Sequence, residues 1–71
     1  DITEEIMRAI IGDAAGKVWR TLSQHKEVSL SQIPKLVGEK DMVVFQAVGW
    51  LACEDKIKYR TERNRTLVSL R

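Results

Sequence analysis

The stretch KIKYRTERNRTLVSLR (residues 56–71) determines the fold class, because apolar and polar side chains alternate along it in two runs. Ile57, Tyr59 and Thr61 alternate with charged residues, and the last residues of the stretch repeat the alternation. This pattern predicts two strands that each bury one face. Pairing Thr61 with Thr66 then forms a β-hairpin whose apolar residues share one side. The residues expected on that inner face are Ile57, Tyr59, Val68 and Leu70.

The same stretch concentrates positive charge. Residues 56–71 carry six Lys or Arg side chains and one acid, a net charge of +5, whereas residues 1–55 carry six cations and nine acids, a net charge of −3. A basic hairpin after short helices is typical of a winged-helix domain whose wing contacts a polyanion. The alternative is a solvated strand face whose charges discourage aggregation. The candidate phosphate contacts on the wing are Lys58, Arg60, Arg63 and Arg65.

Two helical patterns at the start of the chain are divided by Gly12. Residues 13–26 place apolar side chains at spacings of three and four, with Asp13 as the expected N-cap. Residues 1–11 carry a helical signal of their own. Gly12 either interrupts one long helix or separates an arm from the first core helix. We favour separation, because Gly costs about 1 kcal/mol in a helix interior, and we expect an N-terminal helical arm at 1–11 and a winged-helix domain at 12–71.

A helix-turn-helix pattern follows. Residues 28–30 read as a short strand, and Ser31 is the expected cap of a second helix that a left-handed Gly38 ends. Asp41 is the expected cap of a third helix at 42–54. With the hairpin, these elements predict an α+β fold, mainly α, with three core helices, a small antiparallel sheet and a C-terminal wing.

The third helix offers little that could read bases. Base edges in the major groove are read by Arg, Lys, Asn, Gln or Ser side chains, and the helix provides only Gln46. Its apolar residues form two neighbouring stripes: Val44, Ala47, Val48 and Leu51 toward the core, and Met42, Phe45, Gly49, Ala52 and Cys53 beside them. We therefore expect DNA contact that is nonspecific or based on shape, with Lys40 and Gln46 as minor contacts.

The second stripe also favours a competing function, a protein-interaction module. A helix that is apolar nearly all round is buried or docked against a partner. The arm adds an apolar strip that a small core does not fully cover. The surface can pair two copies of the chain or bind another protein, and paired copies can present two wings to one duplex. The expected interface residues are Ile2, Ile6, Ile10, Met42 and Phe45.

Four segments together resemble a family of small prokaryotic winged helix-turn-helix proteins of unassigned function: GKVWRTL (16–22), EVSLSQIPKL (27–36), AVGWLACEDKI (47–57) and TLVSL (66–70). The resemblance covers roughly residues 12 to 70. It implies the winged-helix fold and a nucleic-acid-binding or regulatory role, and it brings no catalytic residue. Asp55 stands where this family commonly has Gly, and we expect it to adopt the left-handed conformation.

Other classes of function find little support. Trp19 and Trp50 can stack on bases, but their helical spacing favours packing in the core or an interface. Cys53 reads as a small buried hydrophobe. A chain with one Cys, one His and no phosphate-cradling glycine loop suggests no catalytic site, no metal site and no cofactor. It has no run of eighteen apolar residues, so we expect a cytoplasmic protein without a membrane partner.

Overall fold

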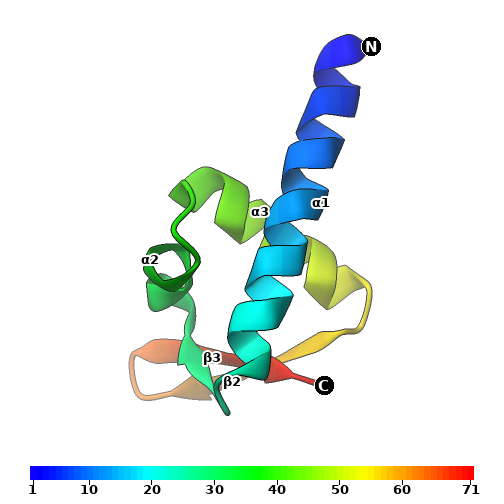
Figure 1. The fold of residues 1–71 in the computed structure, drawn as a ribbon. Coiled ribbons are helices and arrows are strands. Elements are labelled where there is room, and N and C mark those ends of the chain that lie inside the picture. The colour runs from blue at the N-terminus through cyan, green and yellow to red at the C-terminus, as the bar shows by residue number, and fades with distance from the viewer.

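Three helices stand on one side of a small sheet, and the longest of them projects beyond the rest of the molecule (Figure 1). The computed structural model describes residues 1–71. It confirms the predicted mainly helical α+β fold, a winged helix-turn-helix. The elements are α1 (Ile2–Ser23), β1 (Val28–Ser29), a 3₁₀ turn (Leu30–Gln32), α2 (Ile33–Val37), α3 (Asp41–Cys53), β2 (Ile57–Glu62) and β3 (Arg65–Leu70).

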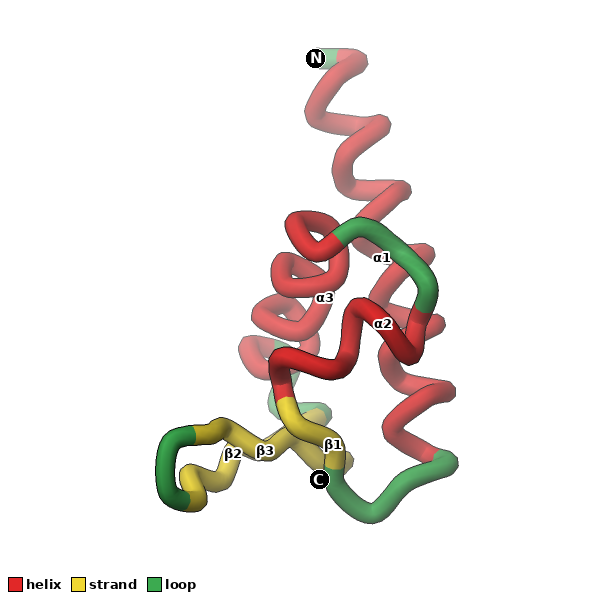
Figure 2. The backbone as a smooth tube through the Cα atoms, turned by 90° about the vertical axis from the view of Figure 1, so that its left-hand side faces the viewer, coloured by secondary structure: helices red, strands yellow, loops and turns green.

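The sheet is antiparallel with the order β1-β3-β2, so the two wing strands extend it away from the helices (Figure 2). The predicted register is confirmed, since Thr61 pairs with Thr66 and Ile57 with Leu70. The pairing continues one step further than expected, to Glu62 and Arg65. The loop of the wing is therefore only two residues long, Arg63 and Asn64. The residues on either side of it, Glu62 and Arg65, are paired strand positions.

The core joins α1, α3 and the inner face of the sheet. The buried residues include the predicted stripe of α3 together with Val18, Leu22, Ile33 and Val68. Two inward predictions are wrong, because Cys53 and Tyr59 are both exposed. Tyr59 lies on the edge strand β2, where the helices no longer cover the sheet.

The helix break expected at Gly12 is wrong, because α1 runs without interruption through it. A helix propagates at little cost once packing has formed its first turns. Asp1 is the N-cap of α1, and its Oδ1 accepts a hydrogen bond from the Thr3 N–H at 3.1 Å. Asp13, the expected N-cap, lies in the middle of the helix instead. The separation of residues 1–11 as a functional arm stays a prediction. None of the helices combines the length and the hydropathy that a membrane crossing requires.

Other boundaries shift by one to three residues. Helix α1 ends at Ser23 instead of 26, and α3 at Cys53 instead of 54. Ser31 does not cap α2, because Leu30–Gln32 tighten into a 3₁₀ turn and Gln32 becomes the N-cap. Asp41 is the first residue of α3 rather than its cap, which is Lys40.

The expected helix ends at Gly38 and Asp55 are confirmed. Gly38 has φ 81° and Asp55 has φ 61°, both left-handed. After Asp55, the Lys56 N–H donates to the Leu51 carbonyl at 3.0 Å, the hydrogen bond of a Schellman ending. The Arg71 N–H then donates to the Lys56 carbonyl at 3.0 Å. This turn fixes where the wing leaves α3.

Candidate nucleic-acid interface

The cations of the wing lie on the face of the hairpin that points away from the helices. The register places Lys58 opposite Ser69, Arg60 opposite Leu67 and Glu62 opposite Arg65, and all of these residues share that outer face. Leu67 is nevertheless buried, which the sequence pattern did not predict.

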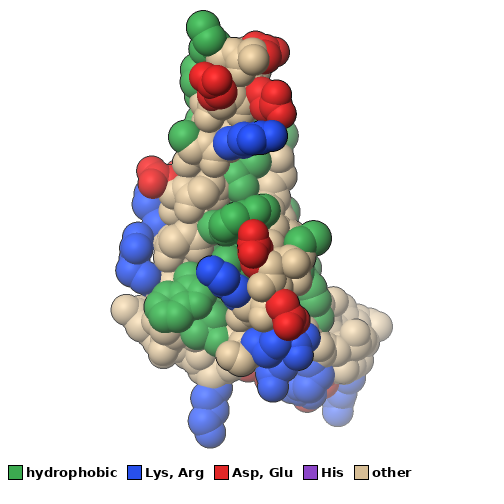
Figure 3. All heavy atoms as spheres, turned by 90° about the vertical axis from the view of Figure 1, so that its right-hand side faces the viewer, with side chains coloured by type: hydrophobic (Ala, Val, Ile, Leu, Met, Phe, Trp, Pro, Cys, Tyr) green, Lys and Arg blue, Asp and Glu red, His purple; other side chains and the backbone are tan.

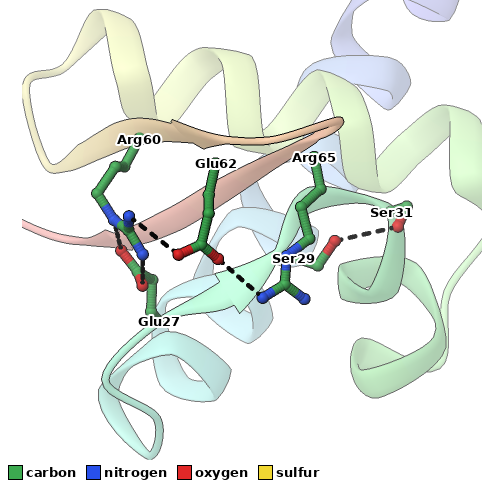
Figure 4. A network of polar contacts seen from close by, with 6 residues as sticks. All are labelled: Glu27, Ser29, Ser31, Arg60, Glu62 and Arg65. Carbon is green, nitrogen blue, oxygen red and sulfur yellow. Dashed lines mark hydrogen bonds and ion pairs between the residues drawn. The ribbon is translucent and has the colours of Figure 1, made fainter.

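Arg60 is held by an acid from outside the hairpin. Its Nε donates to Glu27 Oε2 at 2.9 Å and its Nη2 to Glu27 Oε1 at 2.7 Å, a two-pronged pair that Figure 4 shows beside β1. The hydrogen bond from Arg60 lowers the pKa of Glu27, and the same contact raises the pKa of Arg60. Glu27 therefore stays ionised and competes with any phosphate for this guanidinium.

Glu62 links the two strand arginines. Its carboxylate accepts from Arg65 Nη2 at 3.1 Å and lies 3.6 Å from Arg60 Nη1 (Figure 4). The hydrogen bond from Arg65 is the main reason why the pKa of Glu62 is lowered. Two of the four candidate wing contacts are thus already in ion pairs.

The remaining two candidates carry unpaired charge. Lys58 and Arg63 are exposed and take part in no ion pair. Arg71, at the end of β3, is paired with Asp55, its Nε lying 2.9 Å from Oδ1. Counting Glu27 and Asp55 with the wing lowers its net charge from +5 to +3.

Arg63 occupies a strained position at the tip of the wing. Its φ is 54°, in the left-handed region that favours Gly or Asn. No polar contact within the chain stabilises an arginine at this position, since Arg63 forms neither an ion pair nor a side-chain hydrogen bond. Backbone strain of this kind is concentrated at functional sites, and here it presents a cation at the outermost point of the hairpin.

Helix α3 turns an apolar surface to solvent beside the wing. Met42 is 69% exposed and Phe45 42%. Gln46, the only base-reading candidate on the helix, donates its Nε2 to the Met42 carbonyl at 3.2 Å and so spends a donor on its own backbone. Lys40 is exposed at the start of the helix.

The structure brings some of the predicted residues together and keeps others apart. Phe45 lines a shallow depression of about 260 Å³ with Asn64 and Arg65 at the wing tip, so α3 and the wing form one continuous surface. The apolar strip of the arm, made of Ile2, Ile6 and Ile10, is exposed on the part of α1 that projects furthest from the wing.

Glu27 is the residue of this surface that the sequence reasoning missed. It directly precedes β1, and β1 pairs with β3 so that Ser29 lies opposite Leu67, which in turn lies opposite Arg60. Extending the alternation back by two residues places Glu27 on the same outer face. The missing information was therefore the pairing of β1 with β3, which no local pattern provides.

Comparisons with known proteins agree on the fold. A family model described as "Winged helix-turn-helix domain (DUF2582)" matches residues 5–70. An uncharacterized protein of Methanocaldococcus jannaschii, MJ1608, is 39% identical over 70 residues, which cover 94% of this chain and 99% of the relative.

Two solved structures share the architecture. The solution structure of protein BT2368 from Bacteroides thetaiotaomicron has 28% identity and a TM-score of 0.79, with 89% of this chain and 77% of that chain covered. Reduced HlyU from Vibrio cholerae has 14% identity and a TM-score of 0.63, covering 96% and 76% of the two chains, and shows the fold alone.

Proposed function

The chain belongs to the winged helix-turn-helix family DUF2582, and from this premise we propose that it is a nucleic-acid-binding domain of the transcriptional-regulator type. Its wing contacts the phosphate backbone of DNA without reading the sequence of bases. The proposal includes no catalytic residue and no cofactor.

The observation that carries this proposal is the unpaired charge of the wing, one cation near its base and one at its tip. Lys58 projects from the outer face of β2 and Arg63 from the turn, and neither has a counterion within the chain. Arg60 and Arg65 are reserve contacts, because a phosphate must compete with Glu27 and Glu62 for them. The apolar face of α3 supports backbone contact over base reading, since Gln46 is its only side chain suited to base edges and one N–H of that amide already donates to the Met42 carbonyl.

A salt titration of duplex DNA tests the proposal. Each neutralised phosphate contributes about −0.9 to the slope of log affinity against log salt. Two unpaired cations predict a slope of about −1.8, and engagement of all four wing cations about −3.6. The double variant Lys58→Ala with Arg63→Ala is expected to lose about 1.8 of that slope.

Lys35→Ala serves as the control, because Lys35 is an exposed, unpaired cation on α2, away from the wing. The proposal is wrong if the wing variant binds duplex DNA as the parent does, or if Lys35→Ala weakens binding equally.

We propose self-association as a second function, which the exposed apolar residues favour. Ile2, Ile6 and Ile10 recur every four residues on one side of the projecting half of α1, and Met42 and Phe45 lie on the outward face of α3. Exposed apolar residues grouped on one side of a helix in this way mark interaction sites. Light scattering tests it: the parent chain is expected to dimerise with rising concentration and Ile6→Asp to remain monomeric. A parent chain that stays monomeric at millimolar concentration contradicts this second function.

A further inference from the structure

A groove between α1 and α3 has no part in the surfaces described above. It is open to solvent, has a volume of about 420 Å³, and is lined by Gly12, Gly16, Trp19, Arg20, Trp50 and Lys56, among others. Figure 3 faces this side of the molecule and shows apolar side chains along its middle with Lys, Arg, Asp and Glu side chains among them. A second depression that shares Gly12 and Trp50 extends the groove toward Arg8.

Both tryptophans of the chain meet in this groove with their rings partly uncovered. Trp19 is 45% exposed and Trp50 46%, so of the two placements that their spacing favours, the core or an interface, the core is wrong. They come from different helices and flank one hollow. Proteins that bind single-stranded nucleic acid stack bases on aromatic side chains that are open to solvent.

Glycines keep the floor of the groove low. A Cβ at Gly12 would meet nothing within 4 Å, so no packing inside the chain requires Gly there. A Cβ at Gly16 would meet only Arg20 Nη1, at 3.7 Å. Gly is disfavoured in helix interiors. Helix α1 nevertheless has two glycines, one turn apart, in the groove that the two tryptophans also line. The space that this creates lies within the range of about 300–1,000 Å³ found for small-molecule sites.

Two cations that line the groove have no counterion within the chain. Arg20 and Lys56 form no ion pair, and the contact with the Gly16 position places the Arg20 guanidinium over the floor. Arg8, at the far end, is paired only with the exposed Glu4. An apolar partner would cover Arg20 and Lys56 without neutralising them, whereas an anion satisfies both.

We propose that this groove binds an aromatic base that carries a phosphate, with the base against Trp19 and Trp50 and the phosphate at Arg20 and Lys56. Two sources provide this chemistry, a free nucleotide and a single-stranded nucleic acid. The site lies on another face than the wing and does not depend on duplex binding by Lys58 and Arg63.

Intrinsic fluorescence tests the proposal directly, because the chain has only two tryptophans and both line the groove. Adenosine monophosphate and a short oligodeoxyadenylate are titrated separately, with adenosine and ribose 5-phosphate as half-ligands. We expect saturable quenching by at least one of the first two and affinities about tenfold weaker for each half-ligand. Quenching by the oligonucleotide alone identifies the single strand as the source, and equal quenching by the mononucleotide identifies the free nucleotide.

Three variants complete the test. Arg20→Ala with Lys56→Ala is expected to weaken binding at least tenfold, and Gly12→Leu, which fills the floor, to abolish it. Lys58→Ala with Arg63→Ala is expected to leave the quenching unchanged, and circular dichroism shows that each variant folds. The proposal fails if neither ligand quenches, if the groove variants quench like the parent chain, or if the fluorescence changes only with protein concentration, which would indicate a second copy in the groove.

Discussion

Replacing Glu27 by Gln is expected to strengthen the binding of duplex DNA, although Glu27 contacts no nucleic acid in this account. The substitution removes the carboxylate that holds Arg60 by two hydrogen bonds of 2.7 and 2.9 Å. Arg60 then joins Lys58 and Arg63 as a cation available to phosphate. Glu62 lies 3.6 Å from Arg60 Nη1 but is shared with Arg65, so it restrains Arg60 less than Glu27 does.

The magnitude follows from one added phosphate contact. The salt slope is expected to change from about −1.8 to about −2.7. A slope that is steeper by 0.9 means that the affinity of the variant gains about eightfold over that of the parent chain when the salt is lowered from 1 M to 0.1 M. Because Glu62 still attracts the guanidinium, eightfold is the upper limit of the expected gain at 0.1 M.

The assay is fluorescence anisotropy of a labelled duplex at four or more salt concentrations. Glu5→Gln is the matched control: it removes the same charge from the opposite end of the molecule, where Glu5 forms no ion pair. Equal gains in the two variants mean that net charge alone is responsible. An unchanged slope in Glu27→Gln refutes the reasoning, since Arg60 then either already contacts phosphate in the parent chain or never reaches it.

Four further changes probe the fold and the wing. Gly12→Ala is expected to raise the free energy of unfolding by about 1 kcal/mol in a denaturant titration, because α1 is continuous there and the added methyl group meets nothing. Ile33→Val is expected to cost about 0.5–1.5 kcal/mol by the same measurement, since Ile33 is fully buried. Arg63→Gly relieves a left-handed arginine and is expected to stabilise the hairpin by less than about 1 kcal/mol while weakening duplex binding. Thermal scans are expected to show that the domain loses stability below about pH 4.5. Folding lowers the pKa values of Glu27 and Glu62, so the stability that their ion pairs contribute is present above the unfolded pKa and is lost as the pH falls through the folded pKa. A transition that does not respond to pH in this range contradicts the ion-pair network.

The sequence predicted the wing closely because strand alternation is a local signal. The pairing of Thr61 with Thr66 followed from the requirement that apolar residues share a face, and the left-handed conformation of Asp55 from the Gly that the resembling family commonly has there. Gly12 misled the prediction for a physical reason. Its cost of about 1 kcal/mol is small beside the cooperativity of a helix whose second half is anchored in the core.

Burial was harder to predict than secondary structure. Tyr59 and Cys53 follow apolar patterns, yet both lie where the small core has ended, on an edge strand and in the last turn of α3. The ion pair between Glu27 and Arg60 joins positions 33 residues apart, and only the sheet order β1-β3-β2 brings them together.

The most direct test of the central claim, that the wing contacts nucleic acid, is backbone amide chemical-shift mapping of the chain with duplex DNA at low salt. We predict the largest shifts at Lys58, Arg63 and their neighbours in the wing, with smaller changes at Lys40 and Gln46 and reversal by added salt. Shifts confined to the helices, or no shifts at wing residues at low salt, would contradict the account.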